Sequence, residues 1–195
     1  MREDEETYRT FVAIEVPSQT RAEVVEHINH LRREVPNVRA SWSREDNLHL
    51  TLKFLGNVRV SRMSEICEAA AATAKAIAPL ELTIGGCGWF PPHGKPKVLW
   101  IGIDDPDGQL RNLQDALQEK CAEAGFDCDE RLFHPHLTIA RLRSAEGSRQ
   151  LAETNKSLGF PSQRLAVSEV VVFRSELLRD GSKHTAISRH KLGGG

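Results

Sequence analysis

The chain has 195 residues, of which 39% are hydrophobic and 27% are charged, and its formal net charge is −1. This composition is typical of a globular protein, either one compact domain or two small lobes that share a core. Proteins that bind long nucleic acid without sequence preference usually carry an excess of Lys and Arg. The balanced charge therefore argues against that class, although it leaves a local basic cleft open.

The N-terminal sequence and the hydropathy pattern indicate the cellular location of the protein. The chain begins with the acidic stretch MREDEE rather than with a basic and then apolar leader, and it lacks the run of about 18 apolar residues that a membrane span needs. We therefore expect a cytoplasmic protein, with a monomer as the default state. Residues 1–6 and the glycine-rich end at 193–195 are expected to be disordered.

The first half of the chain alternates strand-like and helix-like segments. Residues 8–16 are rich in β-branched and aromatic side chains and predict a strand. The capping-box pattern TRAE, at 20–23, predicts the start of a helix that ends at Pro36. A strand over 47–56 follows, and apolar residues at helical spacing then predict a helix over 61–77.

The second half repeats this alternation. The predicted segments are, in order, strands over 80–90 and 97–104, a helix over 107–124 that stops before Gly125, a strand over 133–142, a helix over 148–158, and strands over 164–173 and 183–192. This order predicts an α+β protein with two similar lobes, each a small antiparallel sheet with helices on its outer face.

The tetrapeptide His-Leu-Thr-aliphatic occurs twice, at His49–Leu52 and at His136–Ile139. Since side chains alternate along a strand, the His and the Thr of each motif share one face, and the two aliphatic residues occupy the other. Each strand should therefore be buried on one side and line a polar groove on the other. One such motif is ordinary on the wet face of a strand, but two copies at equivalent places in repeated lobes indicate one shared cleft.

Two opposed imidazoles suit general acid–base catalysis, because histidine titrates near neutrality and one ring can accept a proton while the other donates one. Thr51 and Thr138 would supply uncharged donors for the oxygens of a phosphate held between the rings. Arg141 lies five residues beyond His136, which is the opposite face of a regular strand. It reaches the phosphate only if the strand bends or ends near Ala140, and is otherwise a surface arginine.

These motifs and their surroundings resemble the two-histidine (2H) phosphoesterase superfamily, and specifically the bacterial and archaeal RNA 2′,3′-cyclic phosphodiesterases, historically called 2′-5′ RNA ligases. The matching stretches are FVAIEVP, NLHLTLKFLG, GWFPPHGKPKVLWIGI, HPHLTIAR and VVVFRSELLRDG. The resemblance implies a bilobed fold with a central cleft and no required metal or other cofactor. It also implies that His49 donates a proton, that His136 accepts one, and that Thr51 and Thr138 bind phosphate.

The resemblance assigns two further residues and leaves two departures. Arg141 matches an arginine that closes the second motif and contacts phosphate, and Phe11 matches an aromatic that packs against the base of the substrate, with a core role as the alternative. His184 stands where the family often has tyrosine, and Lys97 stands where it often has arginine. Both departures concern substrate detail or packing rather than the two His-x-Thr pairs.

The function implied by the resemblance is hydrolysis of an RNA 2′,3′-cyclic phosphate end to a 2′-phosphomonoester, on a tRNA-like substrate or an oligonucleotide. Ligation of a 5′-hydroxyl end through a 2′-5′ linkage would be a minor reverse activity. Two other classes stay open: a non-catalytic module that binds RNA ends, and a metal enzyme, because His134 and His136 have the spacing of a ligand pair. His27, His30 and His93 are expected at the surface.

Overall fold

A computed structural model describes residues 6–128, 132–178 and 181–193 of the chain, and within these ranges the fold is α+β, as expected. The helices are α1 (Ser18–Glu34), α2 (Met63–Ala76), α3 (Gln109–Glu123) and α4 (Ser148–Leu158), with short 3-10 turns at Glu45–Asn47 and Val60–Arg62. The strands are β1 (Thr7–Glu15), β2 (Ala40–Trp42), β3 (His49–Arg59), β4 (Leu80–Phe90), β5 (Val98–Asp104), β6 (His136–Leu142), β7 (Gln163–Val167), β8 (Glu169–Leu178) and β9 (Gly181–Lys191).

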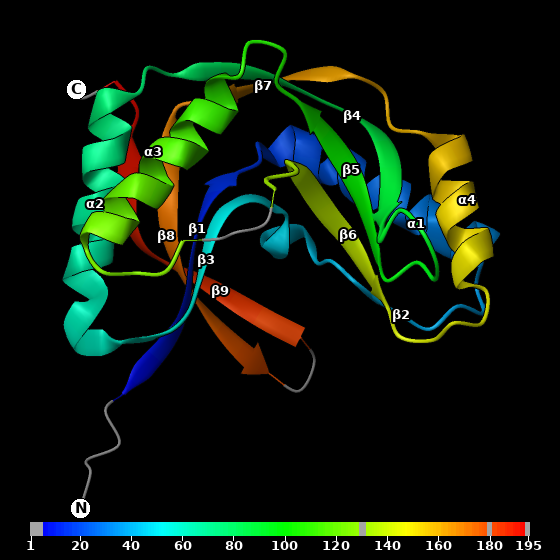
Figure 1. Ribbon diagram of the computed structural model, residues 1–195. Coiled ribbons are helices and arrows are strands. Elements are labelled where there is room, and N and C mark those ends of the chain that lie inside the picture. The colour runs from blue at the N-terminus through cyan, green and yellow to red at the C-terminus, as the bar shows by residue number, and fades with distance from the viewer. Residues whose placement is uncertain (1–5, 129–131, 179–180, 194–195) are drawn as a thin grey trace, which may run out of the picture.

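The described strands form one curved antiparallel sheet in the order β7-β4-β5-β6-β3-β1-β8-β9, with β2 paired to β6. The halves β7-β4-β5-β6 and β3-β1-β8-β9 join where β3 pairs with β6, with Leu50 opposite Leu137. Helices α1 and α4 cover the first half, and α2 and α3 cover the second (Figure 1). The two expected lobes are therefore two halves of a continuous sheet that narrows at its centre.

The chain crosses from one half of the sheet to the other between β7 and β8. Residues 164–173, expected as a single strand, form the end of β7 and the start of β8, which lie in different halves: β7 pairs with β4, and β8 pairs with β1. The break falls at Ser168, whose carbonyl oxygen accepts a hydrogen bond from the Leu192 N–H (2.8 Å). Hydrophobic patterning could not show this crossing, because both strands are apolar and only their partners differ.

The helices agree with the expected segments except at one start. Helix α4 and the stop at Gly125 are confirmed, and Gly125 takes the left-handed φ of +77° that suits a helix end. The capping box is wrong, because α1 begins at Ser18 and has no side-chain cap hydrogen bond. Thr20 is instead buried, and its hydroxyl donates to Gln163 Oε1 (3.4 Å).

His27, expected at the surface, is 8% exposed. Its Nε2 lies 2.9 Å from Oδ1 of the fully buried Asn155 on α4, and the ring packs edge-on against Phe160. The hydrogen bond to Asn155 satisfies a polar ring that would otherwise be costly to bury. His27 therefore joins α1 to α4 on the outer side of the first half of the sheet.

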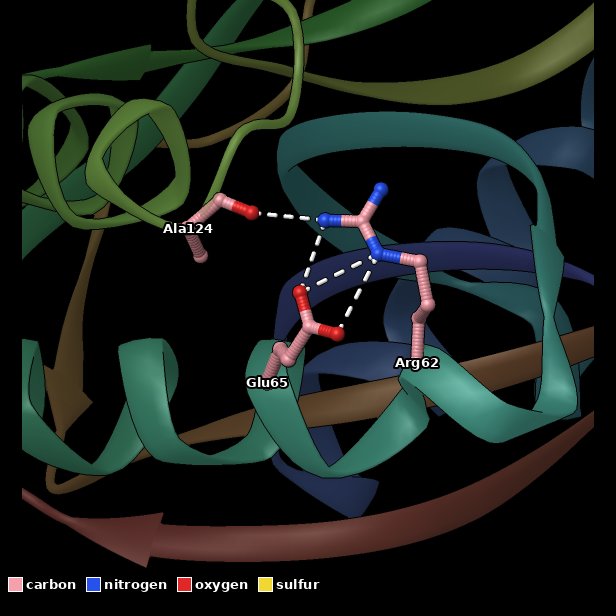
Figure 2. A network of polar contacts seen from close by, with 3 residues as sticks. All are labelled: Arg62, Glu65 and Ala124. Carbon is pink, nitrogen blue, oxygen red and sulfur yellow. Dashed lines mark hydrogen bonds and ion pairs between the residues drawn. The ribbon is translucent and has the colours of Figure 1, made fainter.

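Arg62 links the N-terminal end of α2 to the C-terminal end of α3. Its guanidinium donates to Glu65 Oε2 (2.7 Å) and to the carbonyl oxygen of Ala124 (2.6 Å), which lies just beyond α3 (Figure 2). Nearby, the buried Lys53 donates to the carbonyl oxygen of Asp127 (2.6 Å). These bonds fix the start of the segment that runs from α3 toward β6 and the second motif.

The expected disorder at residues 1–5 and 194–195 lies outside the described residues. Gly193, placed in the same expected tail, donates its N–H to the carbonyl oxygens of Ala74 (3.1 Å) and Ile77 (2.7 Å). Of the helices described, none has the length and apolar character needed to cross a membrane.

Candidate functional site

The two His-x-Thr motifs lie side by side where the halves of the sheet meet. Leu50 of β3 pairs with Leu137 of β6 in antiparallel register, and both leucines are fully buried. Because side chains alternate, the histidine and the threonine of each motif point to the other face, and the register sets each histidine alongside the threonine of the other motif. The four side chains line one cleft: His49, Thr51, His136 and Thr138.

A β-bulge in β6 brings Arg141 to the same cleft. Thr138 and Ala140 pair with consecutive residues of β5, so Ile139 is an extra residue in β6. Ile139 and Ala140 are both buried, and the alternation of faces reverses beyond them. Arg141 therefore lines the cleft, which meets the condition of a bend near Ala140.

A matching bulge in β3 brings an unpredicted aromatic to the cleft. Thr51 and Lys53 pair with consecutive residues of β1, so Leu52 is the extra residue. Phe54 consequently emerges on the cleft face, at the same five-residue offset from its motif's histidine as Arg141. Its ring is 52% exposed. This equal offset from the two histidines was the sequence signal from which Phe54 could have been predicted as a cleft residue.

His49 is held by an aromatic floor. Its ring stacks on Phe11, with centroids 4.7 Å apart and planes 26° apart, and it forms a hydrogen bond with the backbone of Asn47. Burial is the main cause that lowers the pKa of His49 from 6.5 to about 4, and a positive charge on His184 or on Arg141 acts in the same direction. The imidazole is therefore neutral at pH 7 when the cleft is empty.

His136 is oriented by its own backbone and by Phe90. Its Nδ1 donates to the carbonyl oxygen of His134 (2.6 Å), and Phe90 meets the ring edge-on at a centroid distance of 5.0 Å. The donated proton on Nδ1 leaves Nε2 as the nitrogen with a free lone pair. Burial, assisted by the charge of Arg141, lowers the pKa of His136, which keeps this ring neutral as well.

The cleft has a volume of ≈ 710 Å³ and a basic lining. Its arginines are Arg9, Arg44, Arg141 and Arg143, and no Asp or Glu lines the cleft among the residues that the structure describes. A one-signed lining in a concave site concentrates the field on an oppositely charged ligand. The cleft therefore favours an anion, although the chain as a whole has a net charge of −1.

Phe11 lies on the floor of the cleft and is almost fully buried. The ring is 2% exposed and is stacked between His49 and Phe173, whose centroid is 5.2 Å away. It also meets the edge of His184 at 5.0 Å. This burial favours the core role that the sequence left open as the alternative, whereas Phe54 is an aromatic of the same cleft that is largely exposed.

The walls of the cleft are formed by the segment around β2, which the sequence did not predict, and by β9, which it did. Ser43 follows β2 and donates to the carbonyl oxygen of Thr138 (2.7 Å), which holds the segment around β2 against β6. On the opposite wall, Asn47 Nδ2 donates to the carbonyl oxygen of Ser182 (2.7 Å), which holds β9 against the start of β3. β2 has three residues, too few for a periodic pattern to reveal it.

The two departures from the family pattern fall in different places. His184 lines the cleft on β9, next to His49. Lys97 lies before β5, where its backbone N–H donates to the carbonyl oxygen of Phe90 (2.7 Å) and its own carbonyl oxygen accepts from the N–H of Leu142 (2.8 Å).

The sequence offers His134 and His136 as a candidate ligand pair for a metal ion. Among the described residues, no group of three or more His, Cys, Asp or Glu side chains is arranged to hold a metal ion. The Nδ1 atom of His136 is occupied by the backbone of His134 itself.

Residues 15–178 match the family model of the 2′-5′ RNA ligase superfamily. An RNA 2′,3′-cyclic phosphodiesterase of Geobacillus stearothermophilus is 31% identical over 94% of this chain, which spans 57% of that longer relative. One from Thermotoga maritima is 29% identical over 96% of this chain and 97% of its own length.

Solved structures give the same picture. A crystal structure of a protein from Thermus thermophilus superposes with a TM-score of 0.78 at 26% identity, covering 95% of this chain and 98% of that one. Escherichia coli LigT, crystallised with 3′-AMP, superposes with a TM-score of 0.73 at 27% identity, covering 96% and 99%.

Proposed function

The chain belongs to the 2′-5′ RNA ligase superfamily, and on that premise we propose that it hydrolyses RNA 2′,3′-cyclic phosphate ends to 2′-phosphomonoesters. The observation that carries the proposal is the pairing of Leu50 with Leu137, which sets both His-x-Thr motifs on the floor of one basic cleft. The curated relatives described above are named RNA 2′,3′-cyclic phosphodiesterases.

In the proposed reaction, His136 is the general base. Its Nε2 takes a proton from water, the oxygen of that water attacks phosphorus, and the bond from phosphorus to the 3′ oxygen breaks. Protonated His49 gives its proton to the departing 3′ oxygen, so the phosphate stays on the 2′ oxygen. Thr51, Thr138 and Arg141 hold the non-bridging oxygens and stabilise the charge that builds on them.

The lowered pKa of His49 is compatible with an acid role only when substrate is bound. In the empty cleft, burial and the nearby positive charges disfavour the imidazolium. The cyclic phosphate brings a negative charge to that place, and an opposite charge raises the pKa of an imidazole. We therefore propose that His49 gains its proton as part of substrate binding.

The exposed ring of Phe54 supports a nucleotide as the substrate rather than a small phosphoester alone. A half-exposed aromatic ring beside arginines offers a surface on which a base can stack, as in proteins that bind single-stranded nucleic acid. The proposed partner is thus an RNA end, from a tRNA-like molecule or an oligonucleotide. Because one chain supplies both motifs, we propose that the protein acts as a monomer. We also propose that it acts in the cytoplasm.

Ligation is the proposed minor reaction of the same cleft. An RNA 5′-hydroxyl would replace water and give a 2′-5′ linkage. Water at about 55 M outcompetes scarce RNA ends unless the second strand is held in place, because proximity sets the effective concentration of the attacking group.

Turnover separates the enzyme from a module that only binds RNA ends. We expect the protein to convert an oligoribonucleotide with a 2′,3′-cyclic phosphate end in the presence of a chelator. His49→Ala and His136→Ala should each lower kcat by about 10² to 10⁴-fold while still binding the oligonucleotide. Tight binding without conversion by the unaltered protein would favour the binding module, and loss of conversion on chelation would favour a metal enzyme.

A further inference from the structure

A third imidazole, that of His184, stands beside the two motif histidines. His184 lies on β9 opposite Ser175 of β8, and both residues line the cleft. Its ring is nearly perpendicular to that of His49, with centroids 5.2 Å apart and planes 87° apart, and to that of Phe11, with centroids 5.0 Å apart. A ring so close to His49 lies near the phosphate whose departing oxygen His49 would protonate.

The surroundings of His184 determine which of its nitrogens carries a proton. Its Nδ1 is buried and has no hydrogen-bond partner within the described part of the chain. A buried N–H left unpaired is more costly than a bare lone pair, so the favoured form of this ring has a bare Nδ1 and a proton on Nε2. The side chain is only partly buried and lines the cleft, so its exposed edge is the one that carries Nε2–H.

Burial and a nearby positive charge keep the ring of His184 neutral. Burial and the positive charge of Arg9, which also lines the cleft, lower its pKa below 6.5. Its other neighbours include Phe11, neutral His49 and the hydroxyl-bearing Ser175, none of which carries a negative charge.

Resting on the proposed function, we propose that His184 binds the phosphate of the substrate through Nε2–H, as an uncharged hydrogen-bond donor beside His49. An uncharged donor holds an oxygen of the phosphate without adding a positive charge next to the general acid. A positive charge on His184 itself would lower the pKa of His49 and so oppose its protonation, as the charge of Arg141 does.

Three substitutions separate a donor from a packing ring. His184→Gln keeps an N–H near the position of Nε2, His184→Asn moves the N–H to the position of the buried Nδ1, and His184→Phe keeps a ring without a donor. We expect the dissociation constant for inorganic phosphate, measured by calorimetry, to rise about 10-fold or more in the Phe and Asn variants and clearly less in the Gln variant. The kcat/KM for the cyclic-phosphate oligonucleotide should follow the same order.

His190→Phe is the matched control. His190 lies on the same strand outside the cleft, where its Nε2 pairs with the Ser188 hydroxyl (2.9 Å), so its replacement should leave phosphate binding unchanged. Phosphate binding by His184→Phe equal to that of the unaltered protein would overturn the proposal, and so would a Gln variant as weak as the Phe variant. Absence of turnover in the unaltered protein would defeat the proposed function instead, while the phosphate titrations would still decide the role of His184.

Discussion

The two motif histidines differ in surroundings although their motifs match. His49 is stacked on Phe11 and lies nearly perpendicular to the imidazole of His184, and its pKa is lowered to about 4. His136 has one edge-on aromatic neighbour and a hydrogen bond that fixes its Nδ1 proton. The environment thus gives the proposed base its free lone pair, and leaves the proposed acid dependent on the charge of the substrate.

This difference predicts how the rate depends on pH. The kcat/KM profile reflects the free enzyme, in which the pKa values of His49 and His136 both lie below 6.5, so its optimum should be acidic. The kcat profile reflects the complex, in which the phosphate raises the pKa of His49. We therefore expect the alkaline limb of kcat to lie at higher pH than the alkaline limb of kcat/KM. Coincident limbs, or a kcat/KM optimum above neutrality, would contradict this account.

The two His-x-Thr pairs could be predicted from the sequence because the evidence for them is local. A His-x-Thr with flanking aliphatic residues fixes which side chains share a face, whatever the strand pairs with. The burial of Phe11 and the exposure of Phe54 depend on packing against β8, β9 and the bulge in β3, which no short pattern reports. In the sequence, His184 stood out only as a departure from the family pattern. Its position beside His49 could be known only from the fold.

At the level of elements, the paired bulges in β3 and β6 matter most for the site. Each reverses the face of a strand one residue beyond its threonine, so that the fifth residue after the histidine returns to the cleft. In β3 that residue is Phe54, and in β6 it is Arg141. Period-2 alternation assumes a regular strand and therefore predicts the opposite face for both residues. The sequence of one strand does not reveal the bulge, because a bulge is defined by the neighbouring strand as much as by the bulged one.

Arg141→Ala tests the consequence of the bulge in β6. Because the bulge directs Arg141 into the cleft, its removal should weaken the binding of inorganic phosphate by about 10-fold or more, the usual worth of a hydrogen bond to a charged group. Arg149→Ala is the control, since Arg149 lies on α4 and donates to the carbonyl oxygen of Gly94 (2.6 Å) outside the cleft. Equal phosphate affinities in the two variants, measured by calorimetry, would show that Arg141 does not reach the anion.

At the level of the whole molecule, the lobes are built from interleaved segments. The C-terminal β8 and β9 complete the half that contains β1 and β3, and α2 and α3 cover that half from the middle of the chain. The sequence predicted the kinds and the order of these elements, because each has its own hydrophobic period. It did not predict their partners, because strand pairing is settled between segments far apart in the chain.

Burying several neutral histidines should make the fold sensitive to acid. Burial lowers the pKa values of His27, His49, His136 and His184 below 6.5, so the unfolded chain takes up protons before the folded one does. Stability is therefore lost as the pH falls below 6.5. His49 alone should account for about 2 kcal/mol between about pH 7.5 and 5.

Urea unfolding at these two pH values measures this loss. The difference should shrink in His49→Gln, which removes one of the titrating groups. The same free energy of unfolding at both pH values would mean that the histidines are less buried than the fold indicates.

The position of the product phosphate tests the central claim, that two histidines on opposite sides of one phosphate direct its hydrolysis. An oligoribonucleotide with a 2′,3′-cyclic phosphate end is incubated with the protein and a chelator, and the product is identified by phosphorus NMR. We predict a 2′-phosphate alone, with little product from His49→Ala or His136→Ala. A 3′-phosphate, a mixture of both isomers, or full activity in either variant would contradict it.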